Sequence, residues 1–487
     1  MKTWFTLIIV ASILASLSPL KGKARTITLN EAIIVADFQL IKLNKKSEFT
    51  LQTCQEIKSN SLVLAYVFDL EPQGYMVVSA LTTLPPVLGY SFESKFGDLS
   101  HTNPLFELIT ADLLDRIGFT AISFNSYVRK NEYMWKALLD ENIKPQINPF
   151  FEQWPATGDG WLKTNWTQSS PFNNHCPMDP VTGLRSYAGC PATAMAQIMN
   201  FHEATNDTHF DDADDYYHNY AGRQYWIDND FDFADFPSFP QLNLYLDTIN
   251  AHYDGNLPLT NDDKAAMTFA CGVAARQVYT SQGSGTFGVG QAFDAYLRFG
   301  CSTVDLLESN DADLFERLSQ NIKDTLPAHL AVVDSSWTTG HNVVVDGYNT
   351  DEYYHLNFGW GGSYNGWYLL PQEIPYDLTV IEGVVVDIMK NNLTGTDNRK
   401  NLISATSVYP NPAFDVVYLN YKLSCKSPVS ISIYNISREN ILKYEFTDQA
   451  PGNHTVTLSF DDQPAGIYIY QIQAADNISS GKIVRVE

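Results

Sequence analysis

The sequence predicts an α+β fold for most of the chain and a small all-β unit at its C-terminal end. The first observation is a helix after a glycine turn, in which Ala194, Ile198 and Phe201 recur at helical spacing behind Cys190. The second is a set of apolar, strand-like runs at 328–333, 342–348 and 353–358. A helix followed by consecutive strands is typical of α+β domains. The third is a series of short β-rich runs after residue 407.

Length and charge limit the possible functions. A chain of 487 residues is long enough for two to four domains. The net charge of −24 argues against a nucleic-acid partner, because phosphate binding needs clustered Lys and Arg. The six cysteines show no paired metal-ligand spacing and are too sparse for a disulfide scaffold.

Residues 1–24 have the pattern of a secretory signal. Lys2 supplies the positive start, residues 4–17 form an apolar run, and small residues around Ala15 and Ala24 offer cleavage sites. No later segment reaches about 18 unbroken apolar residues, so we expect an exported protein without a transmembrane span.

The next stretch, up to about residue 143, predicts an α+β unit. Two β-rich runs, 74–79 and 87–91, are joined by Pro85 and Pro86. Residues 112–136 then predict a helix. No reactive group of side chains occurs in this part, so its residues alone indicate no function.

Cys190 is the first candidate for chemistry. Pro191 suits the first turn of a helix, where its missing N–H would have no partner. A cysteine at a helix start feels the positive end of the helix dipole, which favours the nucleophilic thiolate. A buried, unreactive cysteine is the alternative interpretation.

Two polar residues at strand ends complete a possible site. His341 begins one predicted strand and Asn357 lies near the end of the next, so neighbouring strands could bring the two together. A cysteine nucleophile needs a base, and the imidazole needs a group that fixes its tautomer. Gln168, upstream of Cys190, is a candidate oxyanion donor. Each residue alone is more often structural, but the order Cys, His, Asn is the papain-type order of roles.

At these residues the chain resembles the streptopain family of cysteine proteases. The motifs that carry the resemblance are KTNWTQ at 163–168, PFNN at 171–174, GCPATAMAQIM at 189–199, GH at 340–341, VDGY at 345–348 and NFGWGG at 357–362. They lie between about 145 and 390. The resemblance implies a papain-like protease domain over 145–390 that cuts protein or peptide substrates, is made as a zymogen, and needs no metal or organic cofactor. Residues 72–96 resemble the family's propeptide, so 25–144 would form an inhibitory pro-domain that is removed near Lys144.

Transferred to this sequence, the family's nucleophile is Cys190, its base His341 and its oxyanion glutamine Gln168. Asn357 and Trp360 match positions beside the histidine. The chain departs from the family at three positions: Pro191 stands where Val is usual, Asn342 replaces a small residue, and Phe358 replaces a Trp. These departures bear on substrate preference more than on activity.

Other polar stretches suggest less. A calcium loop starting at Asp228 would need Gly and Glu where Phe233 and Phe239 stand, so a solvated loop is the better interpretation. The glycine-rich run 283–288 lacks the Lys and Ser/Thr of a phosphate loop. In the resembled family a similar segment borders the cleft, which suggests a wall or lid.

The C-terminal end predicts export. Residues 391–406 are polar and predict a linker. Residues 407–487 contain five predicted β runs, and their regular spacing favours a β-sandwich, which could also belong to an adhesion module. The runs at 408–413, 433–435, 465–470 and 481–486 resemble a type IX secretion sorting domain. The resemblance implies the type IX secretion machinery as a partner, with a final location that is secreted or at the cell surface.

The sequence thus predicts a secreted cysteine endopeptidase made as a zymogen. Two alternatives stay open: a cysteine amidase or transferase on the same fold, and a non-catalytic surface adhesin.

Overall fold

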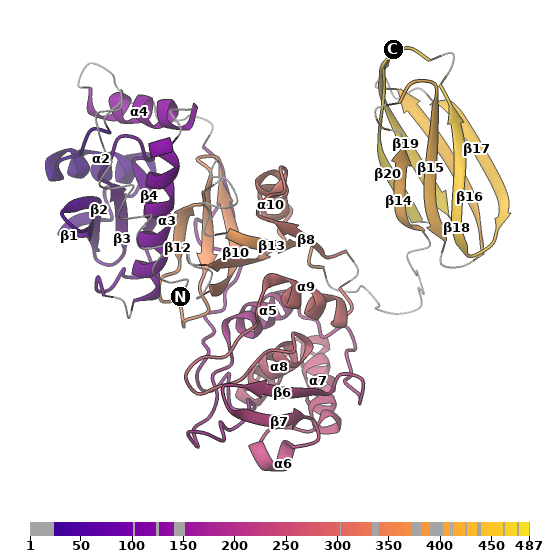
Figure 1. The fold of residues 1–487 in the computed structure, drawn as a ribbon, viewed down its shortest axis with the longest axis horizontal. Coiled ribbons are helices and arrows are strands. Elements are labelled where there is room, and N and C mark those ends of the chain that lie inside the picture. The colour runs from indigo at the N-terminus through magenta and orange to yellow at the C-terminus, as the bar shows by residue number, and fades with distance from the viewer. Residues whose placement is uncertain are drawn as a thin grey trace, which may run out of the picture. The chain divides into compact units, whose positions relative to one another are not determined.

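The computed structural model describes residues 24–486, with gaps at 101–102, 123–125, 141–150, 302, 334–339, 372–380, 390–402, 410, 412, 424–425, 436–439, 461–462 and 475–476. The chain divides into two compact units, Met1–Asn391 and Asn392–Glu487 (Figure 1). The expected signal segment and the expected cleavage point near Lys144 lie outside the described residues, except for Ala24 at the end of the signal segment.

The first part of unit 1 contains four antiparallel strands, which are covered by helices and form one end of a larger sheet. Helix α2 starts after Thr28, whose side chain accepts from the Glu31 N–H while Glu31 bonds back to the Thr28 N–H. The other elements are β1 (Thr50–Ser59), β2 (Leu62–Glu71), β3 (Tyr75–Ser79), β4 (Val87–Ser91), α3 (Pro104–Ile122) and α4 (Ser126–Leu139), with α2 at Leu29–Lys42. The predicted hairpin is therefore confirmed, whereas the single predicted helix over 112–136 belongs to two helices.

The second part of unit 1 holds helix α5 (Cys190–Phe201) and the helices that follow it in the chain. They are α6 (Phe231–Ala234), α7 (Phe239–Asp254), α8 (Asn261–Ala274), α9 (Val289–Arg298) and α10 (Leu314–Lys323). The strands are β5 (Gln153–Trp154), β6 (Tyr216–Tyr220), β7 (Arg223–Ile227), β8 (Asp305–Glu308), β9 (Ala328–Val333), β10 (Gly340–Asn349), β11 (Tyr353–Asn357), β12 (Gly366–Leu369) and β13 (Ile381–Val386). The predicted strands that follow the Cys190 helix are confirmed as β9, β10 and β11, and the mixed helix-and-sheet class is confirmed with them.

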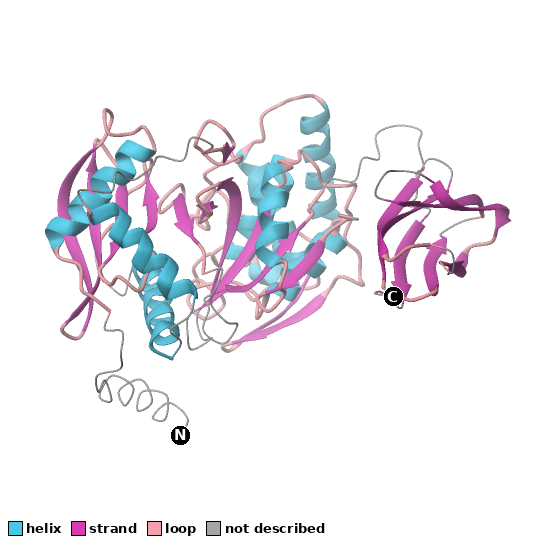
Figure 2. Cartoon of the chain, turned by 90° about the horizontal axis from the view of Figure 1, so that it is seen from above, coloured by secondary structure: helices cyan, strands magenta, loops and turns pink. Residues whose placement is uncertain are grey.

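One antiparallel sheet joins the two parts of unit 1. Within the described residues its order is β1-β2-β3-β4-β12-β11-β10-β9-β13-β8, with β5 paired to β10. The junction is β4 on β12, where Tyr90 pairs with Trp367 and Gly89 with Tyr368. A Cβ on Gly89 would come within 2.9 Å of the Tyr368 ring, so the close approach requires glycine. Figures 1 and 2 show the helices in two groups, one beside the N-terminal strands and one beside the other half of the sheet.

Helix α5 lies in the core of the second part. It packs against α8 and against strands β9 and β10. Ala194 and Ile198, predicted to share its apolar face, are fully buried, and Phe201 is half-buried at its end. Burial of this face fixes the helix, and therefore the start of the helix at Cys190, relative to β10.

Unit 2 is a β-sandwich of two antiparallel sheets. In its described residues the sheet orders are β14-β15-β18 and β17-β16-β19-β20. The strands are β14 (Ile403–Tyr409), β15 (Val416–Leu423), β16 (Ser427–Asn435), β17 (Asn440–Gln449), β18 (Gly452–Ser459), β19 (Gly466–Ala474) and β20 (Asn477–Arg485). The five predicted runs correspond to β15, β16, β18, β19 and β20. Strand β14 begins inside the range expected as a linker because it pairs with β15.

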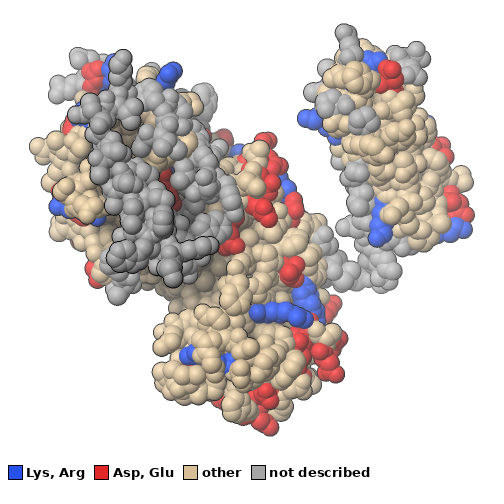
Figure 3. Space-filling model, in the orientation of Figure 1, with Lys and Arg blue, Asp and Glu red and all other residues tan. Residues whose placement is uncertain are grey.

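The acidic composition is visible on the surface. On the face shown in Figure 3, acidic side chains predominate over basic ones in the part of unit 1 that carries α6 and α7. No helix among the described residues is both long and apolar enough to cross a membrane.

Candidate active site

Cys190 is the first residue of α5 and is partly exposed. The turn before it needs a left-handed residue, and Gly189 supplies it with φ 87°. Pro191 occupies the first turn, and the Thr193 N–H closes the first helical bond to the Gly189 carbonyl at 3.0 Å. Burial raises the pKa of the Cys190 thiol, while the backbone N–H of Asn342, the side chain of Asn342 and the backbone N–H of Cys190 itself lower it. The sulfur is therefore held at a helix N-terminus among hydrogen-bond donors.

A cavity of about 350 Å³ opens beside the sulfur. Cys190 and Pro191 form one side, and the glycine-rich run 283–288 forms another. The lining also includes Glu382, Tyr220, Val278 and residues of β9 and β10. The run that the sequence suggested as a wall does line this cavity, which is large enough for a side chain of a bound peptide.

His341 begins β10 and is held by the turn after β11. Its Nε2 lies 2.9 Å from the Phe358 carbonyl oxygen. Its ring stacks on Trp360 with centroids 4.0 Å apart and planes at 21°. A carbonyl only accepts, so Nε2 carries the proton and Nδ1 is the basic nitrogen. Burial lowers the pKa of His341 to about 4, which keeps the imidazole neutral.

No hydrogen bond joins His341 to Cys190 in the part of the chain that the structure describes. The residue that contacts the sulfur from β10 is Asn342, whose Nδ2 lies 3.8 Å from Cys190 Sγ. In the sequence, Asn342 stands out only as a departure from a family pattern, because nothing there shows which side of β10 faces the cysteine.

Gln168 lies next to the turn that precedes Cys190. Its backbone carbonyl accepts from the Ala188 N–H at 2.9 Å, and its side chain is half-buried. This bond joins Gln168 to the residue two positions before Cys190, which is compatible with an oxyanion donor.

Asn357 is buried and joins three segments. Its Oδ1 accepts from Gln197 Nε2 at 3.2 Å and from the Gly359 N–H at 3.0 Å, and its Nδ2 donates to the Thr164 carbonyl at 2.9 Å. Gln197 is on α5, so these bonds tie the cysteine helix to the turn that carries Phe358 and Trp360. The direct partners of the His341 ring are those two residues, and Asn357 acts on the ring through the turn.

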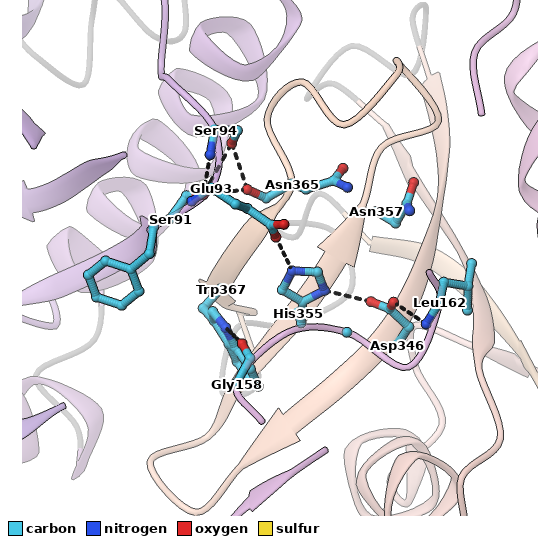
Figure 4. A network of polar contacts seen from close by, with 12 residues as sticks. Ser91, Glu93, Ser94, Gly158, Leu162, Asp346, His355, Asn357, Asn365 and Trp367 are labelled. Carbon is cyan, nitrogen blue, oxygen red and sulfur yellow. Dashed lines mark hydrogen bonds and ion pairs between the residues drawn. The ribbon is translucent and has the colours of Figure 1, made fainter. Parts of the chain in front are cut away.

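The N-terminal part of unit 1 contacts the second part through a buried histidine. His355 on β11 has Nδ1 2.6 Å from Asp346 Oδ1 and Nε2 2.8 Å from Glu93 Oε1 (Figure 4). Both ring nitrogens face carboxylates, so both carry protons, and these contacts raise the pKa of His355 to about 10 despite its burial. Asp346 also accepts from the Leu162 N–H at 3.0 Å. The histidine is a cation shared between the two parts.

A second set of contacts runs from the N-terminal part toward His341. The Ser91 and Ser94 hydroxyls each donate to the Asn365 carbonyl at 2.7 Å (Figure 4). The Asn365 side-chain oxygen accepts from the Phe358 N–H at 3.0 Å, and the Phe358 carbonyl accepts from His341. The serines, Asn365 and Phe358 are all buried. The N-terminal part therefore bonds the turn that positions the candidate base.

Three segments of the chain match protein-family models. Residues 166–368 match the Peptidase C10 family, residues 24–117 match the Spi protease inhibitor, and residues 407–487 match the secretion system C-terminal sorting domain. The first two matches lie in unit 1 on either side of the β4–β12 junction, and the third covers the strands of the β-sandwich.

Relatives resemble the chain at low identity. The thiol protease/hemagglutinin PrtT of Porphyromonas gingivalis is 24% identical over 388 residues, which cover 77% of this chain and 41% of that protein. Streptopain of Streptococcus pyogenes is 23% identical over 333 residues, which cover 63% of this chain and 73% of that protein. The chain thus spans less than half the length of the first of these relatives. Among solved structures, a prointerpain A fragment of Prevotella intermedia is 21% identical, with a TM-score of 0.49 over 70% of this chain and all of the fragment.

Proposed function

The chain carries a Peptidase C10 domain between an inhibitor-like domain and a secretion sorting domain, and from this premise we propose that it is a secreted cysteine endopeptidase made as a zymogen. The observation that carries the proposal is Cys190 at the N-terminus of a buried helix, on the wall of a cavity and 3.8 Å from the side chain of Asn342, the residue after His341 on β10. The proposed substrates are proteins and peptides.

In the proposed reaction the Cys190 thiolate attacks the carbonyl carbon of a peptide bond. The carbonyl oxygen becomes an oxyanion, stabilised by the Cys190 N–H and the Gln168 side chain. The imidazolium of His341 gives its Nδ1 proton to the amine, the C–N bond breaks, and an acyl thioester remains on the sulfur. A water molecule, deprotonated by His341, then attacks the thioester and releases the acid and the thiolate.

The geometry of His341 supports this role. Its bond to the Phe358 carbonyl keeps the proton on Nε2, so Nδ1 is the nitrogen that exchanges protons with the sulfur and the amine. The face of Trp360 stabilises the imidazolium that forms. We propose that the Cys190–His341 pair closes once substrate binds or the N-terminal domain leaves.

The N-terminal domain, residues 25–144, would hold the enzyme latent. Strand β4 continues the sheet of the protease domain, and Glu93 pairs with His355 across the junction. Tyr75 donates to the Tyr364 carbonyl at 3.3 Å, on the same turn as Trp360. The Tyr75 contact acts on the turn that positions His341, which supports an inhibitory role for the domain.

Residues 407–487 would direct the protein through the type IX secretion machinery. The support is the family match, which spans the described strands from β15 to β20 and the end of β14. Export of the zymogen would keep the active enzyme outside the cytoplasm, either secreted or at the cell surface.

A casein assay tests the proposed activity. Wild-type protein, Cys190→Ala and His341→Ala would be incubated with casein under reducing conditions, and new amino groups would be counted. We expect release of peptides by the wild type and none by either variant. Ammonia or acyl transfer to an added amine without new peptides would instead identify an amidase or transferase. Intact casein with all three proteins would favour a binding protein.

A further inference from the structure

A chain of four buried or half-buried polar groups leads from Cys190 into the core. Asn342 Nδ2 lies 3.8 Å from Cys190 Sγ, and Asn342 Oδ1 lies 2.8 Å from His329 Nε2. His329 Nδ1 lies 3.1 Å from the Tyr296 hydroxyl oxygen. Both His329 and Tyr296 have no exposed surface. The proposed reaction uses none of Asn342, His329 or Tyr296.

Strand register explains how Asn342 and His329 meet. On the antiparallel pair β9 and β10, Asn342 lies opposite Ala331, and His329 lies two residues from Ala331 on β9. Side chains two residues apart on a strand share one face, so Asn342 and His329 are diagonal neighbours on the face toward α5. Tyr296 reaches this face from α9.

The protons in this chain can be assigned from the groups themselves. The amide oxygen of Asn342 only accepts, so His329 Nε2 must donate to it. His329 Nδ1 then carries a lone pair and accepts from the Tyr296 hydroxyl. Burial lowers the pKa of His329 to about 4, so the ring is neutral near pH 7 and has one proton to give. The amide group of Asn342 is thereby held with its N–H groups toward the sulfur.

The Cys190 thiolate needs a hydrogen-bond donor such as the Asn342 side chain. Burial raises the pKa of the Cys190 thiol, and a partly buried thiolate must be stabilised by donors. A helix N-terminus ordinarily supplies backbone N–H groups, but Pro191, the next residue, has none. The side chain of Asn342 adds an N–H group to the sulfur, beside the backbone N–H groups of Asn342 and Cys190.

We propose that Asn342 is a further catalytic residue, which donates to the Cys190 thiolate, and that His329 and Tyr296 are positioning residues that fix its amide. The inference rests on the proposed function for its importance to turnover. Its effect on the sulfur can be measured without any proteolysis.

The test is the rate at which iodoacetamide alkylates Cys190 in the full-length protein between pH 5 and 10, followed on the Cys190 peptide by mass spectrometry. Loss of one donor to an anion should slow the reaction at pH 7 about fivefold in Asn342→Ala and move the midpoint of the profile to higher pH. Asn342→Asp, which is nearly isosteric, should slow it further because a carboxylate repels the thiolate. Tyr296→Phe should give a smaller change in the same direction.

The exposed Asn261 at the start of α8 provides the matched control, and Asn261→Ala should leave the profile unchanged. A thermal unfolding curve of each variant checks that the variant is folded. If Asn342→Ala does not fold, the alkylation rates of Asn342→Asp and Tyr296→Phe test the inference. An unchanged or faster reaction in the folded Asn342 variants would overturn the inference, whatever the casein assay shows. A shifted profile in a protein that leaves casein intact would support the inference and contradict the proposed protease.

Discussion

Glu93 and His355 form an ion pair between the N-terminal domain and the protease domain. The Oε1 of Glu93 lies 2.8 Å from the Nε2 of His355, and the opposite ring nitrogen is bound by Asp346. The histidine side chain is 4% exposed, but that of Glu93 is 44% exposed, so solvent weakens the pair. Under the proposed removal of the N-terminal domain, His355 would keep Asp346 and lose Glu93.

Replacing Glu93 by Gln should loosen the latent state. The variant removes one of the two charges that face His355 and leaves the shape of the side chain, so we expect conversion of the full-length chain to its processed form to be about threefold to tenfold faster. Gel time courses measure this rate. The matched control is Glu48→Gln, which breaks an exposed pair within the N-terminal domain, with Lys45 at 3.1 Å. Equal rates for Glu93→Gln and the wild type would contradict a role of this pair in latency.

The same pair should make the stability of the full-length chain depend on pH. The pKa of His355 is raised from 6.5 to about 10, so its stabilising contribution is complete below about pH 6.5 and is lost as the pH rises toward 10. The pKa of Glu93 is lowered from 4.5 by His355 and, more weakly, by Lys163, so its contribution is lost as the pH falls below that value. We expect the melting temperature of the Cys190→Ala chain to be highest between about pH 5 and 6.5 and to decline on either side. Adding Glu93→Gln to this chain should flatten the fall of the melting temperature below about pH 5. An unchanged dependence of the melting temperature on pH would contradict the role assigned to the Glu93–His355 pair.

The hydrogen bonds on the two sides of Asn365 should affect different properties: those to the Phe358 turn should affect catalysis, and those from Ser91 and Ser94 should affect latency. Asn365→Ala removes the acceptor of the Phe358 N–H, and therefore loosens the carbonyl that holds His341. We expect kcat/KM of the processed enzyme to fall about tenfold, since a positioned base contributes two or more orders of magnitude. The double variant Ser91→Ala, Ser94→Ala removes only contacts from the N-terminal domain. It should speed processing of the full-length chain and leave kcat/KM of the processed enzyme unchanged; a fall in its kcat/KM would contradict this separation.

Asn357 should matter mainly for stability. Asn357→Ala removes three hydrogen bonds that join α5, residue 164 and the turn at 359. Each buried bond contributes about 1 kcal/mol, so we expect a loss of about 2–4 kcal/mol in the free energy of unfolding, measured with urea on the Cys190→Ala background. A variant of unchanged stability that has lost its activity would instead show that the Asn357 side chain orients His341 directly.

The sequence predicted the elements of the site whose cause is local. Gly189 and Pro191 mark a helix start, and the β-rich run with His341 marks a strand, so Cys190 and His341 could be placed at the ends of their elements. Five of the seven described strands of unit 2 were predicted as well. Strand β17 was missed although Leu442, Tyr444 and Phe446 alternate with Lys443 and Glu445, a period-two pattern that could have predicted it.

The contacts between distant segments could not be predicted. Tyr90 pairs with Trp367 and Glu93 with His355, although hundreds of residues separate the partners in the sequence. The local sequence around one partner contains no information about the position of the other partner. The same holds for Asn342, whose neighbour along the chain is the candidate base and whose contact with Cys190 depends on how α5 packs on β10. Such relationships arise from packing and register.

The most direct measurement is a time course of the purified full-length chain under reducing conditions, beside Cys190→Ala. We expect the wild type to shorten as the N-terminal domain is removed, and Cys190→Ala to stay full length until a small amount of processed wild type is added. N-terminal sequencing of the product should place the new end near Lys144. Equal shortening of both proteins, with no cleavage of the variant by the wild type, would contradict the claim that Cys190 is the nucleophile of a self-activating protease.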